Sequence, residues 1–201
     1  MISKIKTQII ENIRVYLVLS ILFIIGLSVG IFFVNNSNDV QKLEISNYIN
    51  DFMNKVKEQK INYFLLLKNS AKKNLKLLLI TIFVSMSAFS TIGNVAICLY
   101  KGFSTGYTLS SMIQVLGVLK GIGFGSSLIL LSHIILIPTL FYTMVSTNVF
   151  YKKLIMQDFN NKKVEIIQFV FLVLISSGLM FLASLVETFV GSNLFLSLIN
   201  I

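Results

Sequence analysis

Long apolar runs alternate with short polar segments along this chain. Two of these uncharged runs cover residues 15–34 and 121–151. A helix needs about 20 predominantly apolar residues to cross the hydrocarbon core of a bilayer, so either run is long enough. The pattern therefore predicts an all-α integral membrane protein, a polytopic helical bundle that forms one membrane domain over residues 1–201.

We expect about five membrane-spanning helices in this bundle. Lys101 alone separates the second from the third, so the chain is expected to turn back there at once. The third is weakly hydrophobic because it holds several serines and threonines together with Gln114. It either crosses the bilayer while neighbouring helices shield it, or enters and leaves on the same side. The approximate bounds of the five segments are 15–34, 77–100, 102–119, 121–151 and 166–186.

The fourth segment is too long to be one straight span. A continuous helix over residues 121–151 would extend about 46 Å, well beyond the ~30 Å hydrocarbon core. Its opening glycines, Gly121, Gly123 and Gly125, favour a loop, and Pro138 favours a kink. A break is therefore expected inside this segment.

The polar segment 35–76 predicts a helix outside the bilayer. Asn38 is followed three residues later by Gln41, which is the spacing of a capping box at a helix start. Such a helix is amphipathic and either lies on the membrane or on the bundle, or offers its apolar face to a partner protein. The candidate docking face consists of Ile45, Ile49, Phe52 and Val56, which fall at helical spacing.

The composition agrees with a membrane protein and narrows its partners. Only 12% of the residues are charged and the mean hydropathy is +0.84, whereas an ordinary soluble domain is about 25% charged. The net charge of +9 rests almost wholly on lysine. Lysines beside apolar runs contact anionic headgroups, so membrane lipids and no nucleic acid are the expected partners. Lysine is denser in the inner segments if the N-terminus is cytoplasmic, which favours that orientation.

Few residues of this chain are suited to catalysis. It has one histidine, one cysteine and eight acidic residues, seven of which lie in polar tails and loops. A zinc site needs several such ligands at short spacing, and no common catalytic motif occurs. We therefore expect no catalytic residue, no metal site and no cofactor. Cys98 alone cannot form an internal disulfide.

Four polar residues lie within or at the end of the expected spans. A carboxylate such as Glu187 is costly in hydrocarbon. It either reaches the membrane interface, or makes a buried contact that fixes the helix register, or belongs to an ion pathway. A lone intramembrane histidine is more often hydrogen-bonded between helices than a ligand. The four residues are Asn94, Gln114, His133 and Glu187.

Small residues recur at four-residue spacing in the third expected span. Gly102, Gly106 and Ser110 lie on one helical face, where two backbones can approach closely. Packing within the chain is the simpler interpretation of this face. Contact with a partner or with a second copy is the alternative.

Several segments together indicate a family. The most specific is KGFSTGYT at residues 101–108, in which a lysine precedes a Gly-xxx-Gly element that opens a polar span. The other matching positions are Gly26, Gly30, Val34, Asn35, Ser70, Asn74, Lys76 and the run Ser184-Leu185-Val186-Glu187. In this order and at this spacing, the chain resembles the stage II sporulation protein M family nearly end to end. The segment Leu131-Ser132-His133 before Pro138 departs from the family pattern, so no role is carried onto it.

The resemblance implies a five-span protein of endospore-forming bacteria, with a cytoplasmic N-terminus and an outer C-terminus. It implies a place in the mother-cell membrane during engulfment. There the protein would act as a scaffold without enzymatic activity. It would recruit or hold two cell-wall hydrolases, the amidase stage II sporulation protein P and the lytic transglycosylase stage II sporulation protein D. A membrane subunit of a transporter or channel is the alternative, suggested by the polar third span and by Glu187.

Overall fold

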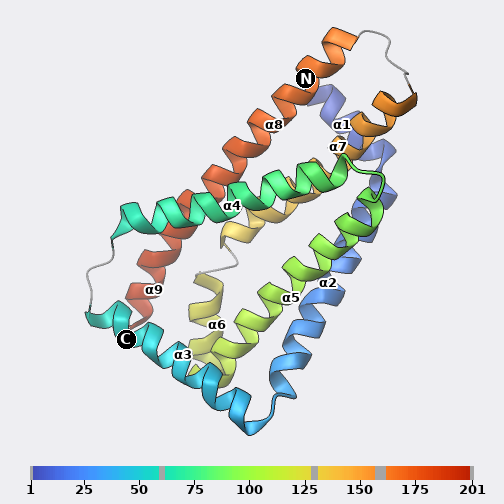
Figure 1. The fold of residues 1–201 in the computed structure, drawn as a ribbon. Coiled ribbons are helices and arrows are strands. Elements are labelled where there is room, and N and C mark those ends of the chain that lie inside the picture. The colour runs from blue at the N-terminus through green and yellow to red at the C-terminus, as the bar shows by residue number, and fades with distance from the viewer. Residues whose placement is uncertain (1, 59–61, 128–130, 157–161, 200–201) are drawn as a thin grey trace.

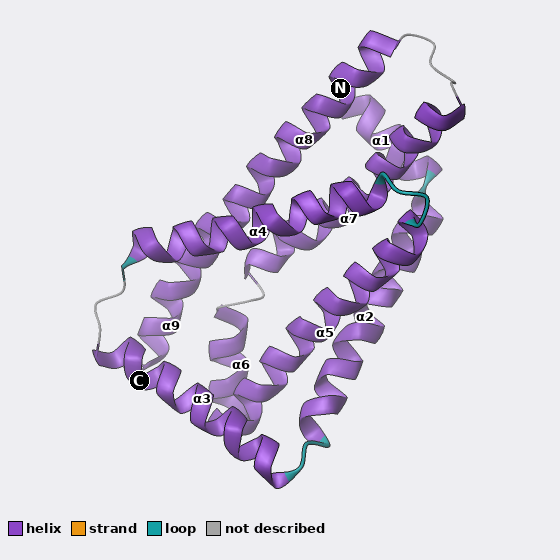
Figure 2. Ribbon diagram, in the orientation of Figure 1, coloured by secondary structure: helices purple, strands orange, loops and turns teal. Residues whose placement is uncertain are grey.

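The computed structural model describes residues 2–58, 62–127, 131–156 and 162–199. Within these ranges the chain is helical apart from short turns and has no strand, as Figure 2 shows, so the all-α prediction is confirmed. The labelled elements are α1 (Ile2–Glu11), α2 (Ile13–Asn35), α3 (Asp39–Glu58), α4 (Tyr63–Ser85), α5 (Ser90–Leu116), α6 (Val118–Gly125), α7 (Leu131–Met156), α8 (Lys162–Leu185), η2 (Val186–Gly191) and α9 (Ser192–Ile199).

Three helical stretches are long and apolar enough to cross a membrane, as judged by length and composition. They cover Ile13–Asn35, Leu131–Ile155 and Lys163–Leu194, so the third continues from α8 through η2 into α9. Apolar side chains project from most sides of α2 and α8, and many remain on the surface of the isolated chain. Helices that are apolar all round need either a protein core or lipid around them. Both helices therefore suit a membrane.

The turn expected at Lys101 is wrong. Lys101 lies in the interior of α5, and the chain turns instead at residues 86–89, between α4 and α5. Ser87 donates its hydroxyl hydrogen to the carbonyl oxygen of Val84 at 2.7 Å there, which helps to end α4. The bounds 77–100 and 102–119 therefore do not describe two helices. The error has a physical cause: Lys101 is buried among polar groups and does not mark a membrane edge.

The break expected in the fourth segment is not placed by the structure, because residues 128–130 between α6 and α7 lie outside the described ranges, and the opening glycines form helix α6 and no loop. The chain reverses at Gly117, whose φ of 80° is one that side chains rarely adopt. Gly121 then lies against the backbone of Met112 and Ile113 on α5, where a Cβ would collide. Helix α7 continues through Pro138. Glycine here allows close helix packing and does not prevent helix formation.

Helix α3 begins as the sequence predicts. The Asn38 side chain accepts a hydrogen bond from the Gln41 backbone N–H at 2.8 Å, and the Gln41 side chain accepts one from the Asn38 N–H at 3.3 Å. This reciprocal capping box pairs backbone N–H groups at the start of the helix, which have no carbonyl partner in a preceding turn. Figure 1 shows α3 and α9 at one end of the molecule and α1 at the other end. Helix α3 lies across the end of α5 and packs against it.

The main core lies where α4, α5, α7 and α8 meet. Its fully buried members include Leu78, Cys98, Leu140, Met144 and Met180, one or two from each of these helices. Serines and threonines are buried beside them, and several donate to a carbonyl oxygen of their own helix, among them Thr81, Thr105, Thr143 and Ser184. Such back-bonding satisfies the hydroxyl without a partner from another helix. The core is therefore well suited to lipid surroundings, where unsatisfied polar groups are costly.

Candidate functional site

A polar cluster joins α4 to the end of α8 and to η2. Ser70 donates its hydroxyl hydrogen to the Glu187 carboxylate at 2.6 Å, and the Asn74 side-chain amide donates to the Ser184 hydroxyl at 2.9 Å. Ser70 and Asn74 are one helical turn apart on α4, so both point to the same neighbour. Asn74 and Ser184 are almost completely buried, whereas Glu187 is partly buried. Two hydrogen bonds thus fix the register between these helices.

Lys101 adds a positive charge to this cluster from α5. Its side chain is only 7% exposed, and it interacts electrostatically with Glu187 and with Lys73 of α4. Glu187 attracts the ammonium group and Lys73 repels it. Lys101 and Glu187 are not at ion-pair distance. Among the described residues, the ion pair is formed by Lys153 and Glu165, at 3.3 Å. The attraction between Lys101 and Glu187 therefore acts over a longer distance than an ion pair, and the repulsion by Lys73 is the larger of the two charge effects on Lys101.

The backbone around Glu187 is unusual. Residues Val186–Gly191 form a π-helix, a conformation that is found frequently at functional sites. In this turn Thr188 is fully buried, and its hydroxyl has no hydrogen-bond partner among the described residues. The arrangement can therefore hold three helices together and can respond to a change in the charge of Glu187.

The four polar residues predicted within the spans do not meet in one site. Asn94 accepts a hydrogen bond from the Ser85 hydroxyl at 2.8 Å across the turn between α4 and α5. Gln114 is exposed near the end of α5. His133 is half-buried near the start of α7, 3.4 Å from the Ser132 hydroxyl. Only Glu187 of the four belongs to the polar cluster, and its bond to Ser70 is part-buried.

The small residues of α5 lie against α2. A Cβ added to Gly102 would collide with the carbonyl oxygen of Phe23, and one added to Gly106 with that of Leu27. The contact is reciprocal, because Gly26 and Gly30 of α2 lie equally close to the α5 backbone. Ser110 continues the face and donates its hydroxyl hydrogen to the Asn35 side-chain oxygen at 3.3 Å. Of all helix pairs, α2 and α5 make the most extensive contact, and Figure 1 shows them side by side.

The candidate docking face on α3 is not an open surface. Ile49 is 3% exposed, and with partly buried Ile45 and Phe52 it packs against Met112 of α5 and Phe124 of α6. The side chain of Val56 lies outside the described residues. The expectation of a free face is therefore corrected: the bundle itself buries it, because the end of α5 and the short α6 also carry apolar side chains.

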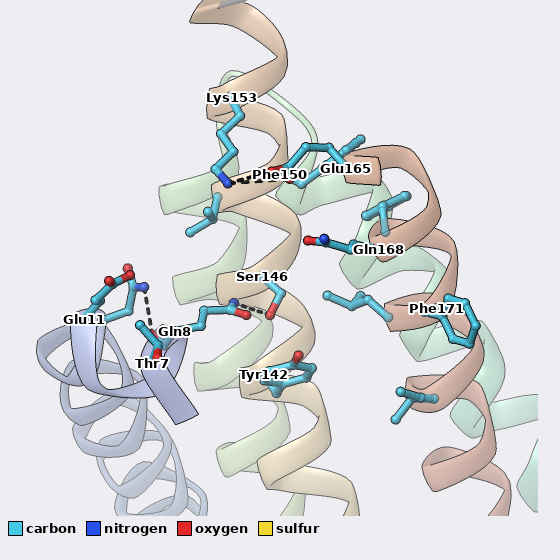
Figure 3. Close-up of a pocket in the computed structure, with 15 residues that line it drawn as sticks. Thr7, Gln8, Glu11, Tyr142, Ser146, Phe150, Lys153, Glu165, Gln168 and Phe171 are labelled. Carbon is cyan, nitrogen blue, oxygen red and sulfur yellow. Dashed lines mark hydrogen bonds and ion pairs between the residues drawn. The ribbon is translucent and has the colours of Figure 1, made fainter. Parts of the chain in front are cut away.

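A cavity with a volume of about 710 Å³ lies between α1, α7 and α8. In Figure 3 Gln8 of α1 donates to the Ser146 hydroxyl, and Lys153 reaches Glu165 at 3.3 Å near its polar end. The stacked rings of Phe150 and Phe169 are part of its apolar lining. Of the charged side chains that line this cavity, Lys153 and Glu165 are paired with each other and Glu11 is exposed at the rim. Within the described residues no three His, Cys, Asp or Glu side chains gather in a way that would hold a metal ion.

Sequence reasoning did not find that the separate matching segments meet. Ser70, Asn74, Lys101, Ser184 and Glu187 were each singled out, and the structure brings all five into one cluster. The available signal was that Lys101, Ser184 and Glu187 interrupt or end apolar runs, whereas Ser70 and Asn74 lie in a lysine-rich segment that gives no such signal. Polar residues that lie on three different helices need one another when water is absent.

The family model described as stage II sporulation protein M matches residues 19–192. The match covers most of the chain, so the chain belongs to the stage II sporulation protein M family. It includes α5 and all five residues of the polar cluster. No curated protein matches the chain, and no solved structure matches it.

Proposed function

We propose that this chain is a membrane scaffold without enzymatic activity that recruits or localises peptidoglycan hydrolases at the engulfing septal membrane during endospore formation. Membership in the stage II sporulation protein M family over residues 19–192 is the observation that carries the proposal. The family makes the chain a sporulation-related membrane protein, and the proposal extends this to a task. The proposed partners are the amidase stage II sporulation protein P and the lytic transglycosylase stage II sporulation protein D.

The proposed topology has five passes, with a cytoplasmic N-terminus and α3 and the C-terminus outside, in the mother-cell membrane. Three passes are the long apolar stretches that contain α2, α7 and α8. Helices α4 and α5 would supply the other two, linked by the turn at residues 86–89. Support comes from the arrangement in Figure 1, where α1 lies at one end of the molecule and α3 and α9 at the opposite end.

This topology can be tested by labelling single cysteines in intact cells on a Cys98→Ser background. Asn47 is exposed on α3, and Lys152 is exposed near the end of α7. An impermeant thiol reagent should label Asn47→Cys in intact cells and Lys152→Cys only after the membrane is opened. The reverse result would invert the proposed orientation.

The scaffold itself is tested by co-purification. The full chain is solubilised with the amidase and the transglycosylase, and each protein is also assayed alone on peptidoglycan. We expect the chain to retain both hydrolases and to release no muropeptides by itself. The double variant Val40→Asp with Leu43→Asp places two charges on the exposed side of α3. If it no longer retains the hydrolases, they bind that side of α3 and not its buried face. Release of muropeptides by the chain alone would contradict the proposal.

One observation favours the alternative, a membrane subunit of a transporter or channel. Lys101 is a buried cation that interacts electrostatically with the Glu187 carboxylate and with Lys73. Ionisable residues inside membranes often mark ion or substrate pathways. The purified chain in liposomes separates the two functions: a scaffold is silent in an ion-flux assay. A flux that Glu187→Gln abolishes would favour transport.

A further inference from the structure

A second, smaller cavity lies where α2 ends and α3 crosses α5. Its volume is about 370 Å³, and Phe33, Tyr48 and Tyr107 contribute aromatic rings to its lining. Phe33 and Tyr107 form one wall, with ring centroids 6.2 Å apart, and Tyr107 stacks in turn on Phe103 at 6.0 Å. Tyr48 comes from α3 and is 77% exposed. The rings thus come from three helices and leave an accessible entrance.

The charge of this cavity is opposite to that of the chain. Glu44 is the one ionisable acid or base among its described lining residues apart from the tyrosines, although the chain as a whole carries a net charge of +9. None of the seventeen lysines and arginines lines it among those residues. Aromatic faces attract cations through the ring quadrupole, and a carboxylate beside them attracts cations directly. The lining therefore suits a cation with apolar substituents.

A buried hydroxyl in the lining has no partner within the chain. Ser111 of α5 is 5% exposed, and its Oγ makes no hydrogen bond to any described residue. A buried polar atom without a partner costs free energy, so such atoms are normally paired with protein, water or ligand. A ligand with a hydrogen-bonding group in the cavity would satisfy it.

The place of the cavity indicates where such a cation comes from. The apolar run of α2 ends at Asn35, so Phe33 lies within one helical turn of the end of a helix that can cross the membrane. Aromatic residues are typical of the headgroup level of a bilayer. Beside the cavity, Phe32, Val40 and Leu43 are exposed apolar side chains that acyl chains can contact.

From these observations we propose that the cavity lined by Phe33, Tyr48, Tyr107, Glu44 and Ser111 binds the ammonium group of a zwitterionic phospholipid headgroup. The rings surround the ammonium group, Glu44 neutralises it, and the Ser111 hydroxyl hydrogen-bonds to the headgroup. The site is independent of the proposed scaffold function, because it requires only that the chain lies in a membrane. Bound lipid would hold α3 against the ends of α2 and α5.

Native mass spectrometry of the purified full chain in detergent tests this site with four lipid probes. Phosphatidylethanolamine and phosphatidylcholine carry the cation, whereas N-acetyl-phosphatidylethanolamine and phosphatidylglycerol lack it. Surface lysines bind anionic lipids in every variant, so the readout is the change that a substitution causes for each lipid. We expect Glu44→Gln and Tyr48→Leu to weaken binding of the two cationic headgroups by roughly fivefold or more, and to leave the other two unchanged.

Matched variants keep the test decisive. Tyr48→Phe retains the ring and should bind as the natural chain does, and Asp51→Asn removes an exposed acid of α3 outside the cavity and should change nothing. Circular dichroism and thermal unfolding verify that each variant is folded. The proposal is overturned if Glu44→Gln weakens all four lipids equally or none of them. Tetramethylammonium and a lysine-containing peptide are added as soluble probes. If Glu44→Gln weakens the binding of these probes but not of the lipids, the cation does not come from a lipid and the proposal is overturned.

Discussion

Helix α5 meets α2 on one side and α4 with η2 on another, and the two contact regions use different forces. Against α2 the glycines of both helices bring the backbones together, so the contact consists of close van der Waals packing. On the other side, the Ser70–Glu187 hydrogen bond joins α4 to η2, and Lys101 of α5 adds an electrostatic interaction with Glu187. Neighbouring residues 101 and 102 thus serve two different contacts.

The two contact regions differ in the substitutions that they tolerate. A backbone contact cannot adjust to a larger side chain, because carbonyl oxygens cannot move aside as a flexible side chain does. A polar cluster can adjust its distances, but it cannot lose one charge without leaving the other uncompensated. The glycine contact is therefore sensitive to volume and the polar cluster to charge. The family match covers both regions.

The largest effect is expected at the glycine contact. Gly106→Leu should reduce the free energy of unfolding by about 3 kcal/mol or more, because the new side chain would collide with the Leu27 backbone. Accumulation in the membrane and thermal unfolding in detergent measure the loss. The matched control is Gly178→Leu on α8, where a Cβ meets nothing within 4 Å. Leu109→Ala should also cost less than Gly106→Leu. Equal accumulation of Gly106→Leu and Gly178→Leu would disprove the packing account.

The next effect concerns the charges. Lys101→Met and Glu187→Leu should each lower stability by about 2 kcal/mol, since each leaves a charge without compensation. The double variant should cost less than the two single changes together, by about 1 kcal/mol. The coupling is modest because Glu187 is only partly buried and the two charges are farther apart than an ion pair. Thermal unfolding of all four chains gives this difference, and strict additivity would show that the two charges do not interact.

The fold was predictable where a single rule decides an element. The long uncharged run of α2 and the capping box of α3 depend on local sequence, and the structure has both. The bounds around Lys101 were wrong because a charge was taken to mark a membrane edge. Whether a lysine lies at an edge or inside a bundle depends on partners such as Glu187, which is 86 residues away in the sequence.

The candidate site was predictable only in pieces, for the same reason. The spacing of Gly102 and Gly106 marks a helix face, but it does not say that the matching glycines are Gly26 and Gly30 of α2. The apolar face of α3 was visible in its periodicity, yet periodicity cannot tell a surface covered by the bundle from one left open to a partner. Packing between distant segments decides both questions.

A smaller effect separates hydrogen bonding from charge at Glu187. Glu187→Gln removes the charge, but its side-chain carbonyl can still accept the hydrogen of the Ser70 hydroxyl. We expect Gln to retain about half of the stability that Leu loses. Thermal unfolding of the Gln and Leu variants side by side provides the measurement. If Gln destabilises as much as Leu, the charge alone accounts for the role of Glu187, and the register contact with Ser70 contributes nothing.

The smallest effects compare one hydroxyl from each region. Ser70→Ala removes a 2.6 Å hydrogen bond to a carboxylate, and bonds to charged groups contribute about 1.5–3 kcal/mol when buried. Because Glu187 keeps some contact with solvent, we expect a loss below this range, about 1 kcal/mol. Ser110→Ala removes a longer bond of 3.3 Å to Asn35 beside the glycine contact, and alanine is small enough to preserve the close approach of α2. Its cost should be a few tenths of a kcal/mol. Thermal unfolding of the two variants under the same detergent conditions measures the order. If Ser110→Ala costs more than Ser70→Ala, the contact with α2 depends on polar bonding after all, and the distinction between a volume-sensitive and a charge-sensitive side of α5 fails.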